Sequence, residues 1–168
     1  MKEILVQLRE PTNLGCMYFT RSYKDQLIFI ESPVRRQMEY TINVGDGPVI
    51  LMFDKNRILI NVEIIYPRHA WKIESQYEIP KPSLSADIEF TEVQLRPGKI
   101  LDSRIVKHAF SFKHYELDDV PLVIYTNEQY QYAKILFSSQ EKEATWVELS
   151  DHCFALIANH YLKGFYIN

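Results

Sequence analysis

The side chains best suited to metal binding are five histidines and two cysteines. His108 and His114 are an even number of residues apart, so a single strand through both would place them on one face. A catalytic zinc needs three protein ligands, and the sequence contains no HxH, HExxH or CxxC spacing to supply them. We therefore predict no metal site and no cofactor.

Nucleophilic catalysis is suggested only by the adjacent residues Asp151, His152 and Cys153. Neighbouring side chains in a strand point to opposite faces, so the imidazole of His152 would not reach the sulfur of Cys153. The sequence also lacks a GxSxG elbow and the glycine-rich loops that hold phosphates. We predict that Cys153 is a small core residue and that the chain is not an enzyme. A hydrolase whose site is assembled from dispersed residues remains an alternative.

Tyrosine is the most unusual feature, with eleven copies, several of them among carboxylates. Aromatic side chains dominate the energies of protein interfaces, and surrounding carboxylates speed the encounter with a basic partner. Tyrosines on a strand with polar neighbours can also simply shield a sheet, so both interpretations stay open. The predicted partner-binding residues are Tyr115, Glu116, Asp118, Asp119, Tyr125, Glu128, Tyr130 and Tyr132. We expect alanine at Tyr130 or Tyr132 to weaken binding and leave the fold intact.

The overall composition is that of a soluble globular protein, with 46% hydrophobic and 24% charged residues. A net charge of −3 argues against a general nucleic-acid binder. Two distant cysteines, Cys16 and Cys153, are typical of reduced thiols in the cytoplasm. The absence of a long uncharged apolar stretch predicts no membrane span and no secretory signal, so we expect a cytoplasmic protein.

Hydrophobic periodicity predicts strands almost everywhere. Residues 57–66 alternate between apolar and mixed positions, and a polar insert at 54–56 separates them from the apolar run 49–53, which predicts a hairpin. Residues 126–140 could begin with a capping box, but their aromatic and β-branched content favours a strand. Three prolines within 67–83 predict a connection without a long regular element. Further strands are expected at 27–30, 86–95, 105–112, 122–125, 145–149, 153–158 and 161–167.

The two halves of the chain show a similar pattern. A shift of 103 positions superposes Asn56 on Asn159 and Leu59 on Leu162 without a gap. The sequence therefore predicts a mostly β chain of two similar antiparallel modules, residues 1–83 and 84–168, packed as one unit. If the repeat is real, residues 24–66 and 127–168 contain their strands in the same order.

The segment VILMFDKNRILINVEII, residues 49–65, resembles the closing hairpin of a family of small bacterial β-domains of unknown function. In that family an alternating return strand carries a glutamate, here Glu63. The resemblance has two-module relatives among toxin-immunity proteins. It implies a cytoplasmic protein that neutralises a cognate toxin, such as a nuclease, by occluding its active site. A self-associating β-domain with exposed strand edges, and hence a homodimer, is the remaining alternative.

Overall fold

The computed structural model describes residues 3–11, 18–21, 28–31, 37–45, 49–65, 68–76, 78–93, 113–117, 120–137 and 143–168. These residues are mostly β, as predicted, and their only regular helical element is the short 3-10 turn η1 (Arg68–Ala70). None of the described helices has the length and apolarity to cross a membrane. Predicted features at Cys16, His108 and residues 105–112 lie outside the described residues.

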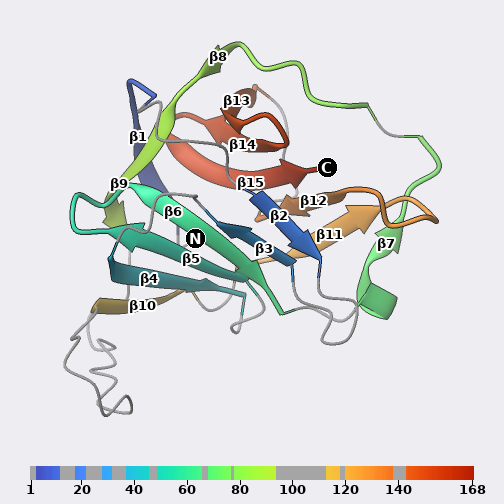
Figure 1. Cartoon of the computed structure of the whole chain (residues 1–168), viewed down its shortest axis with the longest axis horizontal. Helices are drawn as coiled ribbons and strands as arrows, with labels where there is room; N and C mark the ends of the chain where they lie inside the picture. Colours follow the sequence, from blue (N-terminus) through green and yellow to red (C-terminus); the bar gives the residue numbers. More distant parts are fainter. Residues whose placement is uncertain are drawn as a thin grey trace.

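The strands form two sheets (Figure 1). The nine-stranded sheet has the order β7-β11-β12-β15-β14-β13-β8, with β1 paired to β15 and β9 paired to β1. Its strands are β1 (Ile4–Arg9), β7 (Lys72–Ile73), β8 (Leu84–Ser85), β9 (Asp87–Val93), β11 (Val123–Thr126), β12 (Ala133–Leu136), β13 (Thr145–Ser150), β14 (Cys153–Ala158) and β15 (Tyr161–Ile167). The six-stranded sheet has the order β10-β4-β5-β6-β3-β2. Its strands are β2 (Tyr18–Arg21), β3 (Ile28–Glu31), β4 (Met38–Val44), β5 (Val49–Asp54), β6 (Leu59–Ile64) and β10 (Lys113–Leu117).

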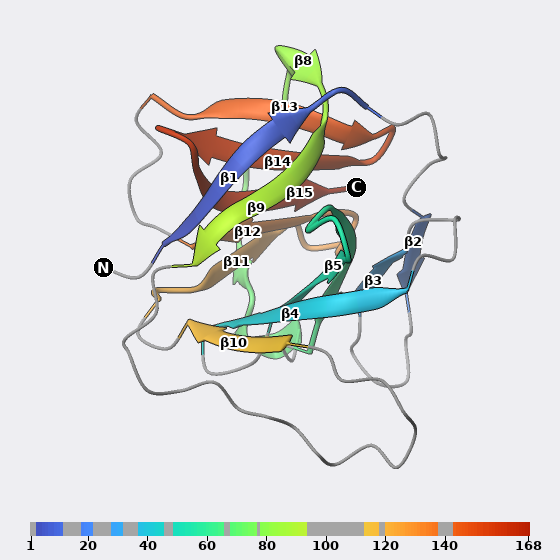
Figure 2. The same ribbon diagram turned by 90° about the vertical axis from the view of Figure 1, so that its left-hand side faces the viewer.

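One hydrophobic core draws residues from both sheets. The six-stranded sheet contributes Ile42, Leu51 and Val62, all with no exposed surface. The nine-stranded sheet contributes alternate residues of its central strands, including Ala155 and Phe165. Because strand side chains alternate between faces, each sheet also has an outer face that points away from this core. Figure 2 shows β1 and β9 crossing obliquely in front of β13, β14 and β15.

The predicted hairpin of residues 49–66 is confirmed as β5 and β6. The buried carboxylate of Asp54 closes the turn, since its Oδ1 accepts hydrogen bonds from the backbone N–H groups of Asn56 at 2.8 Å and Ile58 at 3.0 Å. The alternation of residues 57–66 places Leu59 with Asn61 and Glu63 on the mixed face of the return strand, yet Leu59 is buried. A β-bulge after Met52 shifts the register there, which changes the alternation of faces at the start of β6.

The turn of this hairpin is also tied to β9, which joins the two sheets. The N–H of Phe90 donates to the carbonyl of Arg57 at 3.0 Å, and Ile58 forms an isolated bridge with Glu89. The buried carboxylate of Glu89 accepts from Arg9 at 2.5 Å and from Arg57 at 3.4 Å. Two guanidinium groups therefore neutralise a charge that would be costly to bury alone.

The strand preference at 126–140 is confirmed at 133–136, where β12 lies. The connection predicted at 67–83 also has no long regular element in its described part, 68–76 and 78–83. The predicted boundary between residues 83 and 84 does not separate the sheets. Strands β1 and β7 belong to the nine-stranded sheet, and β10 belongs to the six-stranded one.

The two sheets share an ordered set of five strands. The order β2-β3-β6-β5-β4 in one sheet corresponds to β11-β12-β15-β14-β13 in the other. The registers also correspond: Leu51 pairs with Val62, and Ala155 pairs with Phe165. In each hairpin the bulge falls at the equivalent step, after Met52 in β5 and after Leu156 in β14. Positions on the outer faces of the two sheets can therefore be compared one by one.

Candidate protein-binding surfaces

The predicted partner-binding residues are divided between the two sheets. Tyr115 and Glu116 lie in β10, paired with Ile42 and Asn43 of β4. Asp118 and Asp119 are outside the described residues. The other four predicted residues lie in or next to the nine-stranded sheet: Tyr125 in β11, and Glu128, Tyr130 and Tyr132 in the turn between β11 and β12.

Tyr132 is not exposed, so its predicted role at an open binding surface is wrong. It is 1% exposed, and its ring stacks on that of Tyr166 with centroids 5.3 Å apart. Its hydroxyl donates a hydrogen bond to Oε1 of Glu74 at 2.7 Å. With Phe154 and the partly buried Trp146, these rings form an aromatic cluster on the outer side of the nine-stranded sheet. The partners of Tyr132 are far away in sequence, so local composition could not show this burial.

Tyr130 is half-buried in the turn between β11 and β12. Its φ of 53° is a left-handed conformation, and its N–H donates to the carbonyl of Asn127 at 3.0 Å. The ring lies edge-on to Trp71 at 6.2 Å and packs against the main core. Of these four predicted residues, only Glu128 is exposed.

Tyr125 lies on the outer face of β11 between two lysines. The ammonium of Lys134 is 5.3 Å from the centre of the ring, and that of Lys72 is 5.9 Å away. Lys134 also forms an ion pair with Glu74 at 3.6 Å. The carboxylates near Tyr125 in sequence are thus replaced in space by cations, which argues against a basic partner at this point.

A second surface, which the sequence analysis did not select, lies on the outer face of the six-stranded sheet. Two rows of paired residues cross its central strands, Thr41–Met52–Asn61 and Asn43–Ile50–Glu63. We call these six residues the β4–β6 face. Thr41 is buried and the other five are half-buried. Glu116 in β10 continues the second row, since its Cα pairs with that of Asn43.

The β4–β6 face is rich in hydrogen-bond acceptors. The side-chain oxygens Oδ1 of Asn43 and Asn61 are buried, and neither has a hydrogen-bond partner in the part of the chain that the structure describes. The amide nitrogen of Asn61 donates only a weak bond to the sulfur of Met52, at 3.5 Å. Burial also raises the pKa of the Glu63 carboxyl group. The alternation of residues 57–66 was the signal that could have located this face, because it sets Asn61 and Glu63 opposite the core.

Cys153 is confirmed as a small core residue. It is 1% exposed, and burial raises the pKa of its thiol to about 12, so the reactive thiolate is suppressed at neutral pH. The neighbouring His152 is exposed. Within the described residues, no three His, Cys, Asp or Glu side chains gather closely enough to hold a metal ion.

No protein-family model and no curated protein sequence matches this chain.

Proposed function

We propose that this chain is an immunity-type binding protein that neutralises a cognate bacterial toxin in the cytoplasm by covering its active site. The β4–β6 face carries the proposal, because two of its buried acceptors have no donor among the described residues. A buried polar group left unsatisfied typically costs about 1–3 kcal/mol. A partner that supplies N–H donors to the oxygens of Asn43 and Asn61, as these half-buried side chains turn toward it, removes this cost on binding. The hairpin that carries four of these six residues is also the segment that resembles the small bacterial β-domain family, which has two-module relatives among toxin-immunity proteins.

The charge of the molecule supports a basic partner. The chain has a net charge of −3, and the acceptors of the β4–β6 face include the carboxyl group of Glu63. Basic side chains are the strongest donors to such groups, and nuclease toxins must themselves attract a polyanion. Complementary charge would speed association of the toxin with this face.

The experiment begins by testing whether the gene directly upstream encodes a secreted protein with a toxic C-terminal domain, and its absence would count against the proposal. The domain is expressed in cells with and without the chain, and the purified proteins are titrated against each other. Occlusion predicts protection of the cells and loss of toxin activity that is complete at one chain per toxin. Failure to bind or protect would show that the proposal is wrong. Complete inactivation at a small fraction of that ratio would favour the alternative, a hydrolase whose site is assembled from dispersed residues.

A further inference from the structure

The outer face of the nine-stranded sheet is covered by the chain itself. Residues 74–76 and 78–83, which we call the strap, connect β7 at one edge of that sheet to β8 at the other. The N–H of Glu74 donates to the carbonyl of Thr126 at 2.9 Å, and the N–H of Ser83 donates to that of Trp146 at 3.1 Å. Figure 2 shows the connection passing behind the strands, on the side opposite β1 and β9. The strap therefore runs across the strands over the aromatic cluster.

Contacts of the strap explain why the side chains beneath it are buried. The carboxylate of Glu74 accepts the hydroxyl of Tyr132 and pairs with Lys134. Pro80 is buried, whereas the residues on both sides of it are exposed. Under this cover Phe154 and Tyr166 are only 5% and 1% exposed. In this fold, an extended segment that crosses the strands thus accompanies a buried outer sheet face.

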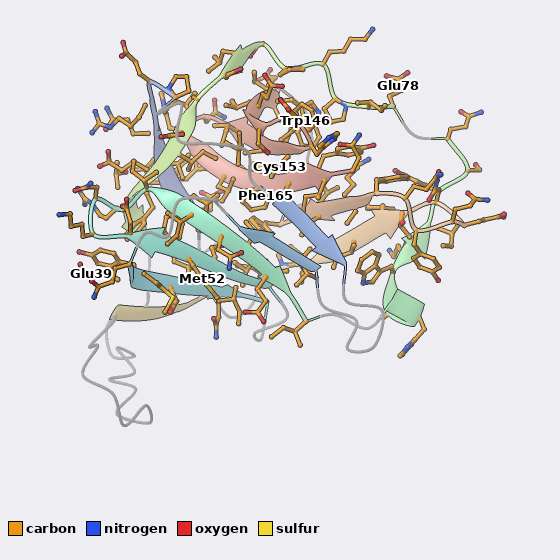
Figure 3. All side chains as sticks on the ribbon, viewed as in Figure 1. Glu39, Met52, Glu78, Trp146, Cys153 and Phe165 are labelled. Atoms are coloured by element: carbon orange, nitrogen blue, oxygen red, sulfur yellow. The ribbon has the colours of Figure 1, made fainter. Side chains whose placement is uncertain are left out.

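The corresponding strand registers show what occupies the same positions on the other sheet. Glu63 pairs with Ile50 as Tyr166 pairs with Phe154, and Met52 pairs with Asn61 as Leu156 pairs with Gly164. The β4–β6 face is therefore the counterpart of the face beneath the strap. Figure 3 shows Met52 on the six-stranded sheet and Trp146 on the other.

The two counterparts differ in burial and chemistry. Under the strap, the counterparts of Ile50, Met52 and Glu63 are Phe154, Leu156 and Tyr166, all buried, whereas the counterpart of Asn43 is the half-buried Glu148. The residues of the β4–β6 face are largely polar and half-buried, and two of their amide oxygens lack donors among the described residues. No other described segment bonds to both edges of the six-stranded sheet as the strap does to the nine-stranded one. The hydrogen-bond acceptors of the β4–β6 face are therefore suited to binding a segment that carries N–H donors.

We propose that the β4–β6 face binds an extended segment of the toxin, which crosses the strands as the strap crosses the nine-stranded sheet. A lysine or arginine of that segment pairs with Glu63, and further N–H groups donate to the oxygens of Asn43 and Asn61. This inference rests on the proposed function and names the surface and the chemistry of the partner. On this proposal Tyr125, whose ring lies between Lys72 and Lys134, is not the main contact with the toxin.

The test measures the affinity of the toxin domain for the wild type and for four variants. Glu63→Gln removes the charge at nearly constant shape and should raise the Kd about tenfold or more, as expected for a lost charge-assisted hydrogen bond. Asn61→Ala should raise it about fivefold. Tyr125→Ala should leave the Kd within about twofold. Glu78→Gln, a matched control on the exposed part of the strap, removes the same charge and should have no effect (Figure 3).

Thermal unfolding of each variant separates binding from folding. We expect Glu63→Gln to melt no lower than the wild type at neutral pH, because burial destabilises the ionised carboxylate of Glu63 that the variant lacks. Unchanged affinity in both Glu63→Gln and Asn61→Ala, with wild-type binding intact, would overturn this inference and leave the proposed function standing. A wild-type chain that neither binds nor protects against the toxin would overturn both.

Discussion

Replacing Tyr132 separates a core residue from an interface residue. Its ring is 1% exposed and stacked on Tyr166, so Tyr132→Ala should lower the free energy of unfolding by about 3–5 kcal/mol, the usual cost of truncating a buried aromatic residue. Tyr132→Phe keeps the ring and loses the 2.7 Å hydrogen bond to Glu74. Since hydrogen bonds to charged groups contribute about 1.5–3 kcal/mol, the phenylalanine variant should lose roughly half as much.

The assay is urea denaturation of the wild type and both variants, followed by tryptophan fluorescence and circular dichroism. Trp146 packs against the same cluster, so its fluorescence reports the local change. A domain of this size has a total stability of about 5–15 kcal/mol, so the alanine variant should be close to unfolding at 37 °C. A loss below about 1 kcal/mol in Tyr132→Ala would refute the burial and restore Tyr132 as a surface residue.

Three further predictions concern other elements. Gly164→Ala should cost about 3 kcal/mol or more in urea denaturation, because its Cβ would lie 2.0 Å from the backbone oxygen of Ile135; a loss under about 1 kcal/mol would contradict this. Glu63→Gln should be more stable than the wild type at pH 7 and equal to it near pH 4. Burial raises the pKa of Glu63 in the folded state, so ionisation of this carboxyl group destabilises the folded state once the pH rises above the pKa of the unfolded chain, about 4.3. Equal melting temperatures of the variant and the wild type at pH 7 would contradict this destabilisation. Cys153 should react with a thiol reagent only after unfolding, so rapid labelling of that residue in the native protein would be inconsistent with its burial.

Local patterns were enough to predict the β5–β6 hairpin and the strands β13, β14 and β15, whereas β1, β4 and β10 were not predicted. Alternation in 57–66 marks one face as core, and the buried Val62 and Ile64 agree. Prolines correctly marked 67–83 as irregular, but nothing in that segment predicted that it would cross the outer face of a sheet. Such a crossing depends on β7 and β8 pairing with strands that come much later in the chain.

The candidate surface was harder to predict for the same reason. Tyr132 and Tyr125 have similar polar neighbours in sequence, yet one is buried under Glu74 and the other lies between Lys72 and Lys134. Sequence proximity gave the wrong electrostatic surroundings for Tyr125, because neighbours across a sheet come from distant segments. Glu63 was noted only as part of a resemblance. Its environment depends on pairing with Ile50 and, through it, Asn43, which the pattern of one strand does not contain.

Hydroxyl-radical footprinting of the chain, alone and in complex with the toxin domain, tests the central claim most directly. Met52 is half-buried in the middle of the β4–β6 face and, as a thioether, reacts readily with oxidants. Tyr125, half-buried on the other sheet, serves as the internal reference in the same digest. We predict that the complex strongly protects Met52 and leaves the labelling of Tyr125 unchanged. Protection of Tyr125 with Met52 labelled as in the free protein would contradict the assignment of the β4–β6 face.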